Sequence, residues 1–152
     1  MEDMSKIIVF KLKEQEYGLS ISDILSIERV MQITQIPQVP HFVKGVVNLR
    51  GDIIPIIDLK ERLSIGETTH TGDTRILIVE KNNAKMGLLV DSATDVMDLD
   101  SSIIEPGPDM INDVNDIYIK GVAKLDEKLI LLLDIHNVLA EEEIHAVNAA
   151  TV

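Results

Sequence analysis

The segment from Asn48 to Leu59 concentrates the side chains that could do chemistry. It reads Asn-Leu-Arg-Gly-Asp-Ile-Ile-Pro-Ile-Ile-Asp-Leu and places Arg50 near two carboxylates, Asp52 and Asp58. Such a group could perform acid–base catalysis in a cleft, form ordinary surface ion pairs, or present the arginine to a partner. A guanidinium can grip a carboxylate or backbone carbonyls through two hydrogen bonds, so Arg50 is a candidate contact residue.

Other catalytic and metal-binding motifs are missing from the sequence. It has no phosphate-binding or dinucleotide-binding glycine motif, no zinc-protease motif and no nucleophile elbow. Because there is no cysteine, thiolate catalysis, disulfides and cysteine-bound metal are excluded. The histidines lack the i, i+4 spacing of a helical metal site; they are His41, His70, His136 and His145. We therefore expect no catalytic residue, no cofactor and no metal.

Four aspartates lie within ten residues, at Asp91, Asp95, Asp98 and Asp100. A calcium loop places its ligands at alternate positions and has glycine at the sixth, and this run has neither feature. We interpret it as a solvated acidic face.

The charge of the chain limits its partners. The 152 residues carry 14 Lys and Arg against 26 Asp and Glu, a net charge of −12. A field of this sign argues against binding to a phosphate backbone, and an aromatic content of 3% argues against base stacking. All four arginines lie in the first half, so a surface that grips an anionic group is expected there: Arg29, Arg50, Arg62 and Arg75.

The N-terminus and the hydropathy pattern indicate a soluble cytoplasmic protein. Met-Glu-Asp-Met-Ser-Lys has no basic region followed by an apolar one, as a signal peptide would. No apolar run approaches the roughly 20 residues that a membrane-spanning helix needs.

Short apolar runs bounded by turn residues predict mostly strands, over residues 7–12, 17–21, 43–49, 53–59, 75–80, 86–90, 117–125 and 128–133. Pro55 has no N–H group, so we expect it on an edge strand or at a bulge. Helical signals are fewer. They predict one turn over 24–27, one over 58–63 and a C-terminal helix that begins at Asp134.

The sequence also predicts an internal repeat of two β-units, approximately 7–65 and 76–139. A shift of 76 residues places Lys44-Gly45-Val46 on Lys120-Gly121-Val122, and a shift of 69 places Tyr17-Gly18-Leu19 on Met86-Gly87-Leu88. Each unit is expected to bury its apolar side by curling into a small barrel. Arg50 falls opposite Asp126, so the arginine belongs to the first copy alone.

The Asn-Leu-Arg-Gly element followed by Pro-Ile-Ile-Asp-Leu resembles the signature of the CheW family of bacterial chemotaxis coupling proteins. The resemblance covers nearly the whole chain, from Val9-Phe10-Lys11-Leu12 to Leu132-Leu133-Asp134-Ile135. It implies a single CheW-like domain over 1–152 that is mainly β. The family fold has two pseudo-repeated SH3-like five-stranded β-barrel subdomains with short helices and a C-terminal helix, and strands can be exchanged between the subdomains.

The resemblance also implies a function. CheW-family proteins are non-enzymatic adaptors that couple the cytoplasmic tips of methyl-accepting chemoreceptors to the regulatory domain of the histidine kinase CheA. The expected location is the cytoplasm, at the membrane-associated receptor array, without nucleic acid and without direct membrane insertion.

Carried over position by position, the resemblance assigns two sets of contact residues. The receptor-binding set is Arg50, Ile24, Ser26, Glu28, Ala93 and Met97. The kinase-binding set is Gly45, Ile33 and Met110. Ser26 departs from the family, which often has an acidic residue there, whereas here the acid comes two residues later as Glu28. For Ile24, Ile33 and Met97, ordinary core burial is the alternative interpretation.

Two other functions stay open on the sequence. One is a small enzyme that uses Arg50, Asp52 and Asp58 in a cleft, and the other is a CheW-like domain derived from an adaptor fused to a receiver. A deep polar pocket would favour the enzyme, and a shallow apolar groove would favour an adaptor.

Overall fold

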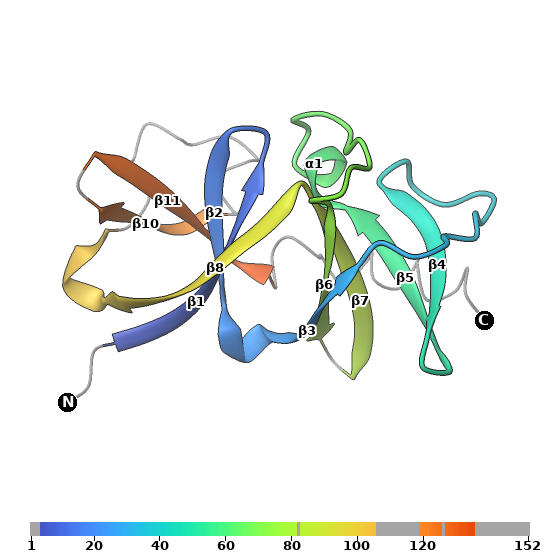
Figure 1. Ribbon diagram of the computed structural model, residues 1–152, viewed down its shortest axis with the longest axis horizontal. Helices are drawn as coiled ribbons and strands as arrows, with labels where there is room; N and C mark the ends of the chain where they lie inside the picture. The colour runs from blue at the N-terminus through green and yellow to red at the C-terminus, as the bar shows by residue number, and fades with distance from the viewer. Residues whose placement is uncertain (1–3, 82, 106–118, 126, 136–152) are drawn as a thin grey trace.

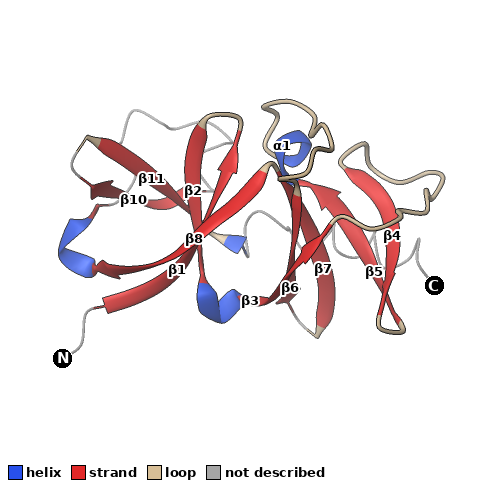
Figure 2. Cartoon of the chain, in the orientation of Figure 1, coloured by secondary structure: helices blue, strands red, loops and turns tan. Residues whose placement is uncertain are grey.

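The computed structural model describes residues 4–81, 83–105, 119–125 and 127–135. These residues form two β-sheets that lie side by side along the long axis of the molecule (Figure 1). Strands dominate, and the helical pieces are short (Figure 2). They are two 3-10 turns, η1 (Ile21–Asp23) and η2 (Ser101–Ile103), and one helix, α1 (Leu59–Arg62). Within the described ranges, no helix has the length and apolar character needed to cross a membrane.

Sheet A contains the N-terminal hairpin and the strands of the C-terminal half. Its order is β8-β1-β2-β11-β10-β9. The strands are β1 (Met4–Leu12), β2 (Gln15–Ser20), β8 (Ser92–Asp100), β9 (Ile104–Glu105), β10 (Ile119–Leu125) and β11 (Lys128–Leu133).

Sheet B contains the strands between them in sequence, in the order β3-β6-β7-β5-β4. They are β3 (Ile24–Arg29), β4 (Val43–Leu49), β5 (Asp52–Asp58), β6 (Arg75–Lys81) and β7 (Ala84–Val90). The mainly β class is confirmed, with two sheets. Sheet B has the predicted five strands, whereas sheet A has six because the two-residue β9 is added to its edge.

The strand orders of the two sheets correspond one to one under the 69- and 76-residue shifts. The order β3-β6-β7-β5-β4 then becomes β8-β1-β2-β11-β10. Each sheet has one parallel pairing at the equivalent place, Ile56 beside Gly87 in sheet B and Leu132 beside Gly18 in sheet A. On this basis we propose that the chain is an internal repeat whose two halves have exchanged their first hairpins, since β1–β2 pair with β11 and β6–β7 pair with β5.

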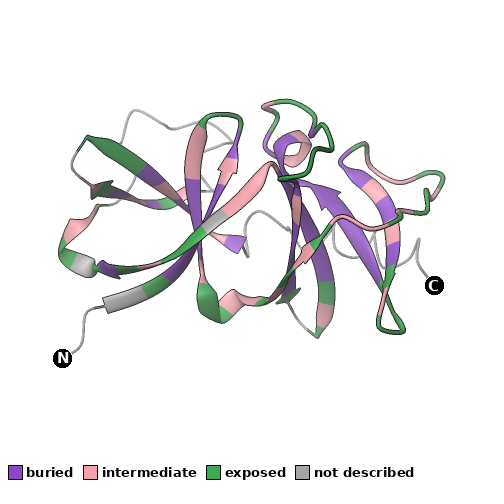
Figure 3. Ribbon diagram, in the orientation of Figure 1, coloured by how far each residue is buried: buried purple, intermediate pink, exposed green. Residues whose placement is uncertain are grey.

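The central strands read as continuous apolar runs because both of their faces are buried. Successive side chains of a strand point to opposite faces. In β1, Ile7 and Val9 belong to the apolar cluster inside sheet A, whereas Phe10 and Leu12 belong to a larger cluster that both sheets share. In β6 and β7, residues likewise divide between the interior of sheet B and the shared cluster. Figure 3 shows the resulting buried band through the middle of both sheets.

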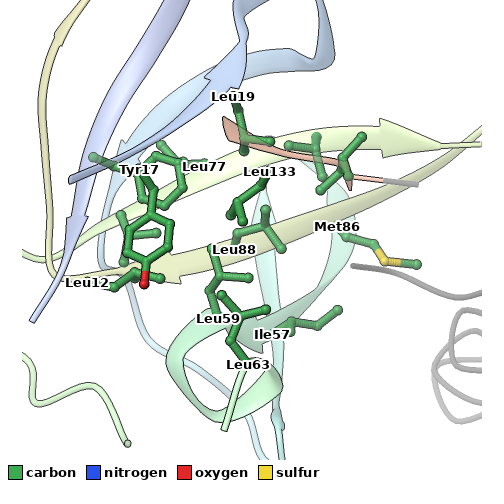
Figure 4. Close-up of a cluster of buried hydrophobic side chains, with 14 of the residues drawn as sticks. Leu12, Tyr17, Leu19, Ile57, Leu59, Leu63, Leu77, Met86, Leu88 and Leu133 are labelled. Carbon is green, nitrogen blue, oxygen red and sulfur yellow. The ribbon is translucent and has the colours of Figure 1, made fainter. Parts of the chain in front are cut away.

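The shared cluster, which we call the central core, joins the sheets into one body (Figure 4). Sheet A contributes Phe10, Leu12, Tyr17, Leu19 and Leu133, and sheet B contributes Ile57, Leu77, Val79, Met86, Leu88 and Val90. Leu59 and Leu63, at the two ends of α1, pack beneath them. Each fully buried aliphatic side chain stabilises the fold by roughly 1.5–3 kcal/mol. Burial also raises the pKa of the Tyr17 phenol, which keeps it neutral in this apolar setting.

Three local predictions differ from the structure. The helical turn over 24–27 is wrong, because these residues pair with β6 as the edge strand β3 and the helical turn lies just before them at η1. Strand β8, which contains most of the aspartate run, was not predicted. Pro55 is in β5, between β4 and β7, and the pairing with β7 begins only at Ile56, so the missing N–H is tolerated.

Two further predictions lie outside the described residues. The C-terminal helix is expected beyond Asp134, and positions 136–152 are not described. The same holds for Met110.

Gly45 permits a close backbone crossing in sheet B. Its φ of 140° disfavours any side chain, and a Cβ atom there would overlap the carbonyl oxygen of Thr34. The crossing allows two hydrogen bonds, from the Thr34 N–H to Val46 O and from the Val46 N–H to Thr34 O, each 2.8 Å long. They tie the segment after β3 to β4, which lies at the opposite edge of sheet B.

Asp58 anchors the loop that follows α1. Its carboxylate is fully buried and accepts hydrogen bonds from the Lys60 N–H at 3.1 Å, the Thr68 N–H at 2.8 Å and the Thr68 hydroxyl at 2.8 Å. The first bond caps α1, which lies within the helical turn predicted over 58–63, and the other two hold the loop against the end of β5.

A graded series of glycine variants tests the crossing at Gly45. We expect Gly45→Ala to lower the free energy of unfolding by about 2–4 kcal/mol, from overpacking against backbone and from the positive φ. Gly51→Ala adds φ strain without a clash and should cost about 1 kcal/mol. Gly72→Ala is the neutral control, because a Cβ atom there meets nothing within 4 Å. Urea unfolding of the three variants measures the order of their losses in unfolding free energy. Equal losses for the Gly45 and Gly72 variants would contradict the predicted order.

The Asp58→Asn variant tests the loop anchor. An amide group keeps the shape but turns a donor toward the N–H groups that the carboxylate satisfies, so we expect a loss of about 2–3 kcal/mol in unfolding free energy. Asp52→Asn is the matched control. Asp52 forms an exposed ion pair with Lys85 at 3.0 Å, and its loss should cost less than about 1 kcal/mol. Denaturant melts of the two variants give the comparison, and a larger loss at Asp52 would show that Asp58 is not the anchor.

Candidate functional site

Arg50 occupies a strained position at the tip of the β4–β5 hairpin. Arg50 and Gly51 have φ values of 52° and 91°, the pattern of a tight turn with two left-handed residues. The Asn48 carboxamide oxygen accepts a 3.0 Å hydrogen bond from the Gly51 N–H and closes the turn. A left-handed conformation costs a non-glycine residue about 1–2 kcal/mol. Glycine or asparagine at position 50 would relieve this strain. The presence of arginine there, in an exposed turn, points to a use for its side chain.

The arginine is exposed and only loosely held. Its side chain is 72% exposed, and its Nη2 atom lies 3.4 Å from the carboxylate of Glu28, whose side chain is 16% exposed. Glu28 is in β3, at the opposite edge of sheet B from the β4–β5 hairpin. The structure therefore brings together Arg50 and Glu28, two of the predicted receptor-binding residues, although they are 22 positions apart in sequence. An exposed pair of this length is weak, so the guanidinium can exchange it for a partner's acceptor.

Strand β3 presents its side chains alternately. Ile24, Ser26 and Glu28 are half-buried on one face, and Ile24 packs against the central core. Leu25 and Ile27, on the other face, are 50% and 42% exposed. These two apolar residues were missed in the sequence, because a helical turn over 24–27 hides the two-residue period. Reading this segment as a strand would have separated the two faces.

Ala93 and Met97 lie in β8, the edge strand of sheet A, and so on a different sheet from Arg50 and Glu28. Both are half-buried, Ala93 against the central core and Met97 against the interior of sheet A. Their neighbour Val96 is 50% exposed.

The predicted kinase-binding residues that the structure describes adjoin each other. Ile33 packs against the interior of sheet B, and its side chain lies 2.9 Å from the place that a Cβ atom on the buried Gly45 would take. Because Gly45 is buried, it supports Ile33 and Thr34 and offers no surface of its own.

A polar pocket of about 430 Å³ lies beside Ile33, between the segment after β3 and the loop after α1. Lys44 lines this pocket, and its ammonium contacts the carboxylate of Glu61 and lies 3.3 Å from that of Glu67. Burial lowers the pKa of Lys44, but the hydrogen bonds to both carboxylates outweigh it, so the pKa is raised. Lys44 therefore stays protonated at ordinary pH, with its charge balanced by the two carboxylates, and it does not act as a proton donor.

The structure separates Asp58 from Arg50 and Asp52, the other two residues that a cleft enzyme would need. Asp52 and Asp58 stand at opposite ends of β5, about 20 Å apart at a strand rise of about 3.3 Å per residue. Asp58 is sealed from solvent, Asp52 pairs with Lys85 and Arg50 pairs with Glu28. A metal centre is not formed by the described part of the chain either, since it contains no cluster of three or more His, Asp or Glu that could hold an ion.

Comparisons with known proteins agree with this architecture. A family model described as the CheW-like domain matches residues 6–143. The chain is 36% identical over 137 residues to a Bacillus subtilis protein named chemotaxis protein CheW, covering 90% of this chain and 88% of that protein. It is 33% identical over 141 residues to chemotaxis protein CheW of Klebsiella aerogenes, covering 93% and 85%.

A solved structure shows the same fold. The crystal structure of the scaffolding protein TtCheW from Thermoanaerobacter tengcongensis superposes with a TM-score of 0.83 at 39% sequence identity, covering 94% of this chain and 92% of that one. The two-sheet arrangement agrees with these matches, which cover nearly the whole length of the chain. The polar residues that a cleft enzyme would need do not meet in one cleft. The chain belongs to the CheW-like family of chemotaxis scaffolding proteins.

Proposed function

We propose that this protein is a non-enzymatic adaptor that couples the cytoplasmic tips of chemoreceptors to the regulatory domain of the histidine kinase CheA. The observation that carries the proposal is Arg50, an exposed cation held in a strained turn and available to a partner's carboxylate or carbonyl groups. Family membership supplies the class of function, and the distance of Asp58 from Arg50 and Asp52 favours it over the cleft enzyme.

The edge strand β3 supports a receptor-binding surface around Arg50. Exposed edge strands are usually protected by charge, and large apolar residues on them indicate a protein contact. Leu25 and Ile27 are such residues, and Glu28 follows directly and reaches Arg50. A receptor tip is a helical hairpin, and an apolar helix face flanked by an acidic residue would match both the leucine–isoleucine pair and the arginine.

The proposed kinase-binding segment follows the receptor-binding strand directly. Only three residues separate the end of β3 at Arg29 from Ile33. Thr34 is bonded to β4, and β4 leads into the turn of Arg50. A receptor that shifts β3 or the hairpin would thus displace Ile33 through short, hydrogen-bonded connections. Two partners that bias one such element are coupled reciprocally.

Calorimetry with Arg50→Ala tests the proposed function. The wild-type protein should bind both a receptor-tip fragment and the kinase regulatory domain. Arg50→Ala should lose about 1–3 kcal/mol of receptor affinity, the range for an interface arginine, and keep its affinity for the kinase. Lys128→Ala is the control for charge, because Lys128 is a comparably exposed cation on the hairpin of sheet A. An absence of binding to either partner by the folded wild-type protein would overturn the adaptor function.

Substitutions along β3 separate contact from packing. Because Leu25 and Ile27 are exposed, the double variant Leu25→Ser, Ile27→Ser should keep the melting temperature of the wild type and weaken receptor binding at least tenfold. Ile24→Ser should instead lower the melting temperature, because Ile24 packs against the central core. Thermal melts and receptor titrations of the two variant proteins show which face of β3 contacts the receptor and which packs against the core. A double variant with full receptor affinity would remove Leu25 and Ile27 from the interface.

A further inference from the structure

Sheet A contains an apolar pocket of about 200 Å³ at the end of β2. It reaches the cluster inside the sheet, and its lining residues among those described are Ile7, Gly18, Ser20, Ile104, Lys120 and Leu132. Four of them are apolar and form the walls, whereas Ser20 and Lys120 bring a hydroxyl and an ammonium group. A dry cavity of about 150 Å³ already holds a benzene ring, so this volume suits an apolar group of about six carbons.

The equivalent place in sheet B holds a larger side chain. Under the 69-residue shift Ser20 corresponds to Leu89, which is fully buried in the interior of sheet B. The pocket found there is lined by Leu89 and by flanking loops, and it does not extend to Ile56 or Gly87, the counterparts of Leu132 and Gly18. With serine in place of leucine, the pocket in sheet A reaches the interior residues, whereas the pocket in sheet B does not.

The lysines at the two positions also differ. Lys44 in sheet B is neutralised by Glu61 and Glu67. Its counterpart under the 76-residue shift, Lys120, is exposed and forms no ion pair with any residue that the structure describes. In a chain of net charge −12, an exposed cation beside an apolar pocket favours an anionic group at that spot.

We propose that this pocket binds a small amphipathic carboxylate, with its apolar tail against Ile7 and Leu132 and its carboxylate at the ammonium of Lys120 and the hydroxyl of Ser20. The pocket is formed by residues of sheet A, whereas Arg50 and β3 belong to sheet B, and the proposal does not rest on the adaptor function. The chemistry is that of other ligand pockets, a mostly apolar cavity with a few polar groups that fix orientation.

Amide NMR titrations of the full chain with three probes test the site. Hexanoate has both the tail and the charge, 1-hexanol has only the tail, and acetate has only the charge. We expect saturable shifts of the Gly18 and Ser20 amides with hexanoate, about tenfold weaker binding of 1-hexanol, and no saturation with acetate. Absence of saturation with hexanoate, or acetate binding as tightly as hexanoate, would overturn the proposal.

Three variants assign the binding to these side chains. Ser20→Leu reproduces the residue of sheet B and should abolish hexanoate binding while the melting temperature stays within a few degrees of the wild type. Lys120→Gln should weaken hexanoate about tenfold and leave 1-hexanol unchanged, a result that stands even if Ser20→Leu fails to fold. Lys124→Gln is the charge-matched control, because Lys124 pairs with Glu105 at 3.2 Å and does not line the pocket. Equal losses in both lysine variants would show a general charge effect and refute the site.

Discussion

The central core between the sheets is the feature on which the rest of the structure depends. It forms because β1 and β6 bury both of their faces, one inside their own sheet and the other against the opposite sheet. The hairpins that carry these strands pair with strands distant in sequence, β1–β2 with β11 and β6–β7 with β5. Neither half of the chain therefore holds a complete sheet, and the loss of either half would expose apolar surface worth many kcal/mol. The two sheets form one cooperative unit for this reason.

A buried centre leaves the edges and the hairpin tips for recognition. Strand β3 is an edge strand with exposed Leu25 and Ile27, and Arg50 occupies the hairpin that approaches the same strand through Glu28. The backbone crossing at Gly45 fixes the segment that joins these parts, and the buried carboxylate of Asp58 fixes the loop on the other side of the polar pocket. Rigid support of this kind positions exposed groups without using their own side chains for stability.

The two sheets share an arrangement of strands but differ at corresponding surface positions. Arginine appears at the hairpin tip of sheet B and aspartate, Asp126, at the matching place in the sequence. In sheet B, Lys44 is ion-paired and Leu89 is buried. The corresponding residues of sheet A are Lys120, which is exposed, and Ser20. The other interior positions remain apolar on both sides, since each must fill a similar space, and the buried Leu89 opposite Ser20 is the exception. Differences at these few positions allow the two sheets to present distinct binding groups on one scaffold.

The sequence by itself determined the mainly β class, most of the strands, the helical turn near 58–63 and the tight hairpin turn at Gly51, because these follow from local apolar runs and turn residues. It did not reveal β8 or the strand character of 24–29, since both are edge strands that bury one face at most and carry mixed polar patterns. Only the tertiary structure decided that Arg50 meets Glu28, that Gly45 is a packing residue beneath Thr34, and that Asp52 and Asp58 are far apart. These facts depend on how distant strands pair and curl, and pairing between segments far apart in sequence leaves little trace in the local pattern of residues.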